Sequence, residues 1–352
     1  MLSDAQFREL VSGRWKGPLA GGLRAGLALL EPLYAATIRR RNRQFDTGRR
    51  QPHRVAAPVI SVGNLTVGGT GKSPLVAWLA DWLSRRGIAA TIISRGYGAR
   101  GGRPNDEALE LAARLPGVPH LQNPDRLAAA EEALRANPRQ VLILDDAFQH
   151  RRIARDLDIV LLDALEPFGY ERLLPRGLLR EAVENLARAQ VVALSRSDAV
   201  NPARRTEIES RVKCVAPQAA WLELEHRPGG LVSASGRRME LAALSGLSVA
   251  AFCGIGNPAG FRHTLAAAGL SVAEMLELPD HCPYDGRTMQ RLTLWVSRLP
   301  QATAVLCTRK DLVKIPQDEI AGRPLWALAI EMAITRGEAL LANRLESLLK
   351  SV

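Results

Sequence analysis

Short apolar runs alternate with helically spaced apolar residues along most of the chain, and this alternation predicts the architecture. Val59, Ile60 and Val62 form one such run, and Leu75, Leu79 and Leu83 follow it at helical spacing. Strands that alternate with helices are typical of a parallel sheet with helices on both faces. We predict strands at residues 59–62, 89–94, 141–146, 158–163, 191–194, 247–253, 303–307 and 326–330. We predict helices at residues 72–83, from 105, after 124, within 173–181, at 259–268 and at 338–349.

The pattern weakens around residues 200–245, where turn-forming residues gather at 227–230 and 233–236. A domain boundary is therefore expected there. We divide the chain into an N-terminal segment, 1–54, a larger α/β core, 55–230, and a second, smaller α/β region, 231–352.

A helically spaced apolar stripe marks the N-terminal segment, and it consists of Leu23, Leu27, Leu30, Tyr34 and Ile38. Only 14 residues separate Arg24 from Arg39, which is too short to span a bilayer, and no signal-peptide cleavage site precedes a mature start. Residues 1–54 hold 11 Lys or Arg and 4 Asp or Glu, so +7 of the net charge of +11 lies here. Such a basic amphipathic helix fits the surface of an anionic membrane. A helix packed on the core with a solvated basic end is the alternative.

A glycine-dense turn between the first predicted strand and its helix predicts a phosphate site. The turn contains Gly68, Gly69 and Gly71, followed by Lys72 and Ser73. Glycines let backbone N–H groups converge on a polyphosphate, the helix N-terminus adds partial positive charge, and the hydroxyl can ligate Mg²⁺. The first glycine of the G-x-x-x-x-G-K-[ST] pattern is replaced by Thr66.

Carboxylates and imidazoles outside this turn are the candidates for metal binding and proton transfer. Asp145 and Asp146 end a predicted strand, where nucleotide-hydrolysing folds place the partners of Mg²⁺. Asp106, His150 and His281 are candidate bases. A phosphoryl acceptor could be water, as in an NTPase, or a hydroxyl, as in a kinase.

Composition excludes several classes of protein. The content of 47% hydrophobic and 24% charged residues is that of a globular protein. The four cysteines have no C-x-x-C spacing, so we expect neither a zinc site nor a disulfide framework. A reducing compartment is therefore expected.

The sequence Gly-Ile-Gly-Asn-Pro at 254–258 lacks the third glycine of a dinucleotide turn, so we interpret it as a strand-to-helix turn.

Two other functions compete with a kinase. A switch GTPase needs a D-x-x-G turn, but Ala147 and Phe148 follow the two aspartates, and the sequences at 195–198 and 308–311 only approximate N-K-x-D. A nucleic-acid-dependent ATPase needs a spread basic groove with stacking aromatics, but aromatic residues are only 5% and the charge gathers at one end. A kinase is favoured.

The motifs together resemble the tetraacyldisaccharide 4′-kinase family. They are the sequences at 60–64 and 68–74, 94–98, Asp-Asp-Ala-Phe-Gln-His at 145–150, 253–258, Asp280-His281 and Thr-Arg-Lys-Asp at 308–311. The similarity spans nearly the whole chain. It implies transfer of phosphate from ATP, with Mg²⁺, to the 4′-hydroxyl of a tetraacyldisaccharide 1-phosphate, a lipid A precursor. It also implies a P-loop NTPase-like fold.

Carried over residue by residue, the resemblance implies roles for individual side chains. Asp106 accepts the hydroxyl proton, His281 tunes its basicity, and His150 supports the metal or nucleotide. The nucleotide-binding residues are Thr66, Val67, Gly68, Gly69, Thr70, Gly71, Lys72 and Ser73, and the metal-binding residues are Ser73, Asp145 and Asp146, with Lys72 also catalytic.

The resemblance also implies where the protein works. We expect a peripheral protein on the cytoplasmic face of the bacterial inner membrane, with neither nucleic acid nor an obligate protein as partner.

The sequence departs from the family pattern at four positions. Ala147 replaces a glycine, Asn105 and Ala108 replace Gly and Pro, and Cys282 replaces a second histidine.

Overall fold

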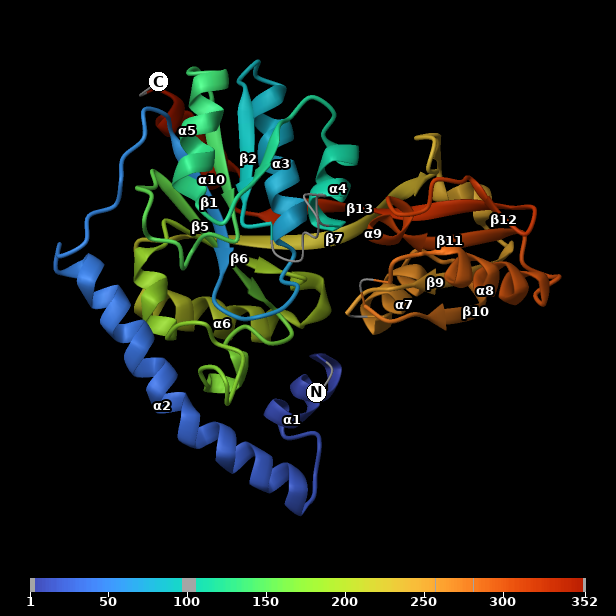
Figure 1. The fold of residues 1–352 in the computed structure, drawn as a ribbon, viewed down its shortest axis with the longest axis horizontal. Helices are drawn as coiled ribbons and strands as arrows, with labels where there is room; N and C mark the ends of the chain where they lie inside the picture. The colour runs from blue at the N-terminus through green and yellow to red at the C-terminus, as the bar shows by residue number, and fades with distance from the viewer. Residues whose placement is uncertain (1–3, 97–105, 257, 281, 351–352) are drawn as a thin grey trace. The chain divides into compact units, whose positions relative to one another are not determined.

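A parallel β-sheet covered by helices forms the framework of this protein (Figure 1). The computed structural model describes residues 4–96, 106–256, 258–280 and 282–350, without the side chains of residues 4, 5, 106 and 107. These residues fall into two compact units. The first lies within Met1–Tyr97, Leu115–Glu225 and Met332–Val352, and the second within Gly98–Arg114 and His226–Glu331. The α/β fold with a parallel sheet is thus confirmed.

Strand β1 (Val59–Asn64) lies at the centre of the sheet in the first unit. It is parallel to β4 (Val141–Asp145) on one side and to β5 (Leu157–Asp163) on the other. The sheet continues from β4 through β2 (Ala90–Ser94) to β3 (His120–Gln122), and from β5 through β6 (Val191–Ser195) to the start of β7 (Ala220–Val232).

Helices cover both faces of this sheet. Every residue of β1, β4, β5 and β6 is buried, and side chains alternate between the faces of a strand, so both faces must be covered. The covering elements are α3 (Lys72–Ser84), α5 (Arg126–Ala136), the 3₁₀ helix η2 (Val183–Arg188), α6 (Pro202–Val215) and α10 (Glu338–Leu349). This arrangement leaves the carboxyl ends of the strands as the place for a ligand site.

The second unit is a smaller α/β layer structure. Strands β10 (Ser271–Glu277), β9 (Ser248–Cys253) and β11 (Ala304–Thr308) are parallel, and β11 pairs with part of β13 (Arg323–Arg336). Helices α7 (Pro258–Ala267) and α8 (Gly286–Ser297) pack into separate apolar clusters. Strand β8 (Arg238–Met239) pairs antiparallel with β7, and β12 (Glu319–Ile320) pairs antiparallel with β13. Helix α4 (Asp106–Arg114) packs against α9 (Arg309–Leu312).

Two predicted elements were wrong. Residues 227–230 do not form a turn but continue β7, because Gly229 lacks a side chain and Glu331 packs directly against it. Residues 173–181 contain no α-helix, since their backbone N–H groups bond to other segments: Leu173 N donates to Glu31 Oε1 (2.8 Å) and Arg180 N to Leu65 O (2.7 Å).

The two units differ from the predicted ranges 1–54, 55–230 and 231–352. Helix α4 falls in the second unit although its residues lie within the range 55–230, and residues 332–352 fall in the first unit. Strands β7 and β13 are 13 and 14 residues long, and each has one part in the first unit and one part in the second.

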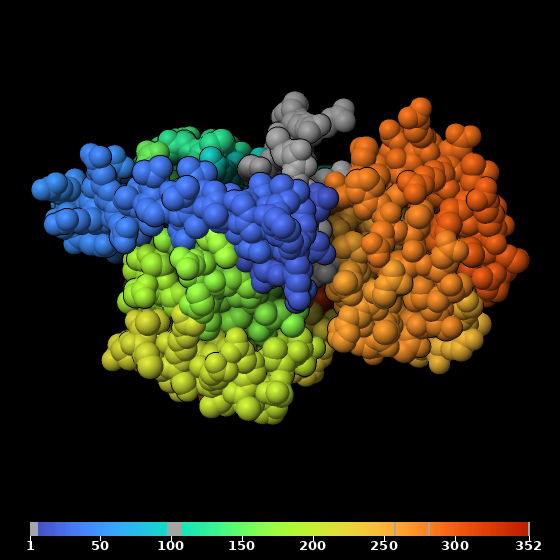
Figure 2. All heavy atoms as spheres, turned by 90° about the horizontal axis from the view of Figure 1, so that it is seen from below, coloured from blue at the N-terminus to red at the C-terminus, as the bar shows by residue number. Residues whose placement is uncertain are grey.

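The N-terminal segment forms α1 (Asp4–Ser12) and the 29-residue α2 (Pro18–Asp46), which run along the surface (Figure 2). Of the predicted stripe, Tyr34 and Ile38 are half-buried, and Tyr34 Oη donates to Arg180 O (2.9 Å). The exposed apolar residues of α2 are Leu19, Leu23, Leu29, Leu30 and Leu33. One face of α2 therefore packs on the first unit while another is apolar and open. In the described part of the chain, no helix combines the length and apolarity that crossing a bilayer requires.

Candidate functional site

The glycine-dense turn lies between β1 and α3, as the sequence predicts. Strand β1 ends at Asn64 and α3 begins at Lys72, with Gly71 as a left-handed N-cap (φ 85°) and Gly68 also at positive φ (114°). The first backbone N–H groups of α3 have no partners within the helix, and the helix dipole makes this end attractive to anions. Gly68 and Gly69 are exposed, so a ligand can reach their backbone.

Hydrogen bonds hold this turn against residues 178–180. Val67 N donates to Leu178 O (2.9 Å), and Thr66 pairs with Leu179 in an isolated antiparallel bridge. Thr66 is 5% exposed and is not among the residues with positive φ. Since its backbone needs no left-handed conformation, a threonine fits where the general pattern has glycine.

Asp145 and Asp146 follow at the carboxyl end of the neighbouring strand. Asp145 is buried at 3% exposure, whereas Asp146 adopts a left-handed conformation (φ 49°). Both carboxylate oxygens of Asp146 accept from Arg180 Nη1 (2.8 Å), and Lys72 Nζ lies 3.6 Å from Oδ1. Burial raises the pKa of Asp146, but Lys72, Arg180 and Arg126 outweigh that effect and lower the pKa below its ordinary value.

The donor set allows a divalent cation beside the turn. The hydroxyl of Ser73, at the start of α3, and the carboxylate of Asp145 are hard oxygen ligands of the kind that Mg²⁺ takes. Asp146 fits less well, because Arg180 already engages both of its oxygens. No cluster of three His, Cys, Asp or Glu suited to a metal occurs among the described residues, so such an ion would depend on phosphate oxygens and water for its remaining ligands.

His150 lies near a group of arginines behind the aspartates. Its Nε2 is buried without a hydrogen-bond partner in the described structure, and its backbone N donates to Ala147 O (2.8 Å). Burial, with added repulsion from Arg126, Arg152 and Arg155, lowers the pKa of His150 to about 4. The imidazole is therefore neutral near pH 7, which suits a supporting role better than proton exchange at that pH.

Ala147 fits the position where the family pattern has glycine. Its methyl group is fully buried in the apolar cluster that includes Val59, Leu144 and Ile153, and it is not among the residues with positive φ. The left-handed residue of this turn is Asp146 instead. The substitution therefore costs the turn no backbone strain.

The remaining predicted residues belong to the second unit. Helix α4 begins at Asp106, whose side chain is not described, and His281 lies outside the described residues, as do Asn105, Asn257, Arg100 and Arg103. The structure therefore does not show whether Asp106 and His281 pair.

The sequence at 308–311 has a structural role near the predicted Asp-His turn. Asp311 is fully buried, and it accepts from Gly254 N (3.2 Å) and from Thr308 Oγ1 (2.7 Å). Tyr284 also interacts with Asp311, and burial raises the pKa of Tyr284 above its ordinary value. This network ties the ends of β9 and β11 to the segment that follows residue 281.

Two arginines of this site were not predicted. Arg126 is 5% exposed, and its Nη2 donates to Asp145 O (3.1 Å) and Asp146 O (2.9 Å). Arg196 pairs with Asp163 and donates to Gly69 O (3.2 Å). Arg196 comes two residues after the predicted strand 191–194, so its place at the carboxyl edge of the sheet could have been found, whereas no local pattern marks Arg126. Two further arginines near the turn already have partners: Arg180 binds Asp146, and Arg176 donates to Val11 O (3.1 Å).

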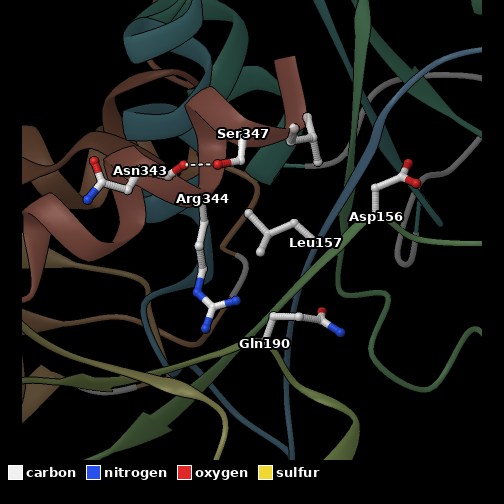
Figure 3. Close-up of a pocket in the computed structure, with 7 residues that line it drawn as sticks. Asp156, Leu157, Gln190, Asn343, Arg344 and Ser347 are labelled. Carbon is white, nitrogen blue, oxygen red and sulfur yellow. Dashed lines mark hydrogen bonds between the residues drawn. The ribbon is translucent and has the colours of Figure 1, made fainter. Parts of the chain in front are cut away.

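A hollow of about 480 Å³ lies elsewhere in the first unit (Figure 3). It is lined by Asp156, Leu157, Gln190, Asn343, Arg344, Ser347 and Leu348. Asp156 and Gln190 directly precede β5 and β6, so this hollow is at the amino ends of the strands, opposite the phosphate turn. It is therefore no part of the candidate site.

Comparisons with known proteins agree with one another. The family model described as "Tetraacyldisaccharide-1-P 4'-kinase" matches residues 23–350. A tetraacyldisaccharide 4′-kinase of Anaeromyxobacter sp. (strain Fw109-5) is 36% identical, and the match covers 96% of this chain and 95% of that protein. A tetraacyldisaccharide 4′-kinase of Geobacter sulfurreducens is also 36% identical, and the match covers 93% of this chain and 94% of that protein. The crystal structure of the "apo" form of LpxK from Aquifex aeolicus in complex with ATP has a TM-score of 0.74 at 29% identity, and covers 93% of this chain and 99% of that chain.

Proposed function

Since the chain belongs to the tetraacyldisaccharide-1-P 4′-kinase family, we propose that its phosphate turn and neighbouring carboxylates carry out the family's reaction. The reaction transfers the γ-phosphate of ATP to the 4′-hydroxyl of a tetraacyldisaccharide 1-phosphate in lipid A biosynthesis. The arrangement of the turn, Lys72 and the two aspartates at one sheet edge is the observation that carries the proposal. A GTPase switch and a nucleic-acid-dependent ATPase are not favoured, because the family model and the named relatives agree on a kinase.

Residues 66–73 bind the phosphates of ATP. The backbone N–H groups of residues 68–71 and of the first turn of α3 donate to phosphate oxygens, and Lys72 adds positive charge beside the β- and γ-phosphates. Asp146 holds the side chains of Lys72 and Arg180 in place, so that both cations are preorganised before ATP binds. Neutral His150 supports the turn that carries the aspartates.

Ser73 and Asp145 would hold Mg²⁺ beside the phosphates, by the donor set described above. There the ion would supply positive charge that offsets the negative charge of the phosphates.

Asp106 accepts the proton of the 4′-hydroxyl, and His281 tunes the basicity of Asp106. The position of Asp106 at the first turn of α4 supports this role, because a helix N-terminus stabilises the ionised carboxylate that can accept a proton. Asp106→Asn should lower kcat by roughly 10²–10⁴-fold, the usual contribution of a general base, with ATP affinity unchanged. His281→Gln should shift the pH profile of kcat. Loss of ATP binding in Asp106→Asn, or an unchanged kcat, would contradict the assignment.

Helix α2 docks the protein on the cytoplasmic surface of the inner membrane, where an acylated substrate resides. Leu29 and Leu33 are 78% and 67% exposed, so burial in lipid would remove apolar surface from water. A hollow of about 560 Å³ on the same helix is lined by Ala36, Arg39, Arg40, Asn42, Arg43, Asp46 and Asn185. This combination of apolar and basic surface fits an interfacial helix over anionic headgroups.

A radiolabelled nucleotide assay tests the function as a whole. The protein is incubated with Mg²⁺ and γ-labelled ATP plus the tetraacyldisaccharide 1-phosphate, with GTP and no acceptor, and with ATP plus single-stranded DNA. Label should enter the glycolipid in the first reaction only. Turnover of GTP without an acceptor, or DNA-stimulated hydrolysis of ATP without labelled glycolipid, would instead identify one of the alternative classes.

A further inference from the structure

Helix α1 brings an arginine onto the phosphate turn. A Cβ atom added to Gly68 would lie 3.1 Å from Arg8 Cζ and closer still to Arg8 Nη2, so the guanidinium contacts the backbone of Gly68 itself. Gly68 is one of the two exposed glycines of the turn. Arg8 is therefore located where phosphate oxygens of a bound nucleotide would be nearest.

Apolar burial and hydrogen bonds keep α1 in this place. Leu10 and Val11 are 1% and 3% exposed. Arg176 Nη1 donates to Val11 O (3.1 Å), and Arg24 Nη1 of α2 donates to Leu10 O (3.4 Å). Since α1 is anchored at its carboxyl end and to α2, the position of Arg8 is set by packing rather than by a free chain end.

The charge of Arg8 is unmatched, unlike that of the other cations around the turn. Lys72 and Arg180 pair with Asp146, and Arg196 pairs with Asp163. Among the side chains that the structure describes, no carboxylate lies within ion-pair distance of the Arg8 guanidinium, which is exposed. A guanidinium without a counter-ion beside a phosphate turn is well suited to bidentate bonds with phosphate oxygens.

We propose that Arg8 is a further nucleotide-binding residue, which donates hydrogen bonds from its guanidinium to the phosphates of ATP held by the turn. This inference rests on the proposed function of the turn. Arg8 lies ahead of residues 23–350, the part matched by the family model, so its role does not follow from that match.

Equilibrium binding separates this role from a structural one. Arg8→Gln, Arg8→Lys and a control, Lys16→Gln, are titrated with the Mg²⁺ complex of a fluorescent methylanthraniloyl ATP, without glycolipid. Lys16 is an exposed cation of the same N-terminal segment, which does not contact Gly68 in the described structure. The Kd of Arg8→Gln should rise about tenfold or more, as expected when a hydrogen bond to a charged group is lost. Arg8→Lys should retain part of the affinity, and Lys16→Gln should bind like the wild type.

The Kd values for ATP, ADP and AMP and the steady-state KM values provide the decisive measurements. Arg8→Gln should weaken the binding of ATP and ADP more than that of AMP, and should raise KM for ATP while KM for the glycolipid is unchanged. A Kd equal to that of the wild type would overturn the inference, as would tighter binding, which would mean that Arg8 obstructs the turn. If the wild-type protein neither binds ATP nor labels the glycolipid, the proposed function itself fails; if it does both and Arg8→Gln matches it, only the role of Arg8 fails.

Discussion

Individual side chains set the charge and the backbone geometry of the phosphate site. Asp146 compensates two cations, Lys72 and Arg180, within a region that also holds Arg126. Burial, together with the nearby arginines, lowers the pKa of His150 and keeps its imidazole neutral near pH 7. The site is therefore poised to accept an anion, and it depends on a few carboxylates for its stability when empty.

The low pKa of His150 predicts a pH-dependent stability. The folded pKa is about 4 and the ordinary value is 6.5, so between these values the unfolded chain binds a proton that the folded chain does not. The free energy of unfolding should therefore fall as the pH is lowered from 6.5 towards 4. In His150→Gln the loss of stability between pH 7 and pH 5, measured by urea unfolding, should be smaller than in the wild type. Exposed His263 provides the control: His263→Gln should keep the wild-type pH dependence, and an equal effect of both variants would contradict this assignment.

Gly63 lets two backbone segments approach each other closely. A Cβ atom at Gly63 would lie 2.5 Å from Phe148 Cβ and 2.6 Å from Phe148 N, and Phe148 is fully buried. Because the backbone N cannot rotate away, Gly63→Ala should reduce the free energy of unfolding by about 1–3 kcal/mol, as overpacking does. Chemical denaturation measures this change.

The matched control for Gly63 lies in an exposed helix. No atom is within 4 Å of a Cβ added at Gly26 of α2, so Gly26→Ala should be neutral or more stable by up to about 1 kcal/mol. If both substitutions changed stability alike, the close approach of Gly63 and Phe148 would not be the cause.

At the scale of elements, α2 connects its open apolar face to the phosphate turn. Tyr34 bonds to Arg180 O, and Asn42 Nδ2 donates to Glu181 Oε2 (2.8 Å). Residues 178–180 in turn bond to the phosphate turn through Val67 and Leu65. The proposed docking helix and the nucleotide site are thus linked by a short chain of direct contacts.

The open apolar face of α2 leads to a prediction about membrane binding. The double variant Leu29→Glu, Leu33→Glu places charges on this face and should weaken association with vesicles of anionic phospholipid by at least about tenfold, because each buried leucine contributes on the order of 1.5–3 kcal/mol. Binding of fluorescent ATP should not change. Co-sedimentation measures the partition, with Leu294→Glu as the control, since Leu294 is 57% exposed on α8 and not on α2. Wild-type partition of the double variant would refute docking through this face.

For the whole molecule, the uneven charge predicts a salt effect. The net charge is +11, and residues 1–54 contribute 11 − 4 = +7 of it. Raising the salt from 0.1 M to 1 M shortens the Debye length from about 10 Å to about 3 Å, so association with anionic vesicles should fall steeply while association with neutral vesicles changes little. Equal binding to both vesicle types at low salt would show that the basic segment does not contribute.

Elements with a strong periodic or apolar signal were predictable. Strands β1, β4, β5 and β6 are buried on both faces, which produces continuous apolar runs. The edge strand β10 was missed because most of its residues are at least partly exposed and leave no such run. Helix α8 was also missed, although its buried residues Leu292 and Val296 are four residues apart, which is helical spacing.

The features that could be predicted from the residues alone are local: the strand, glycine turn and helix from Val59 to Ser84, the carboxylates at the end of β4, and a basic N-terminal helix. Their order along the chain and their residue types suffice for a phosphate site, because its groups come from adjacent backbone. Only the tertiary structure decided that Arg180 and Lys72 share Asp146, that Arg8 rests on Gly68, and that α4 joins the second unit. Those contacts join residues far apart in sequence, and they arise from packing and charge compensation that no local pattern records.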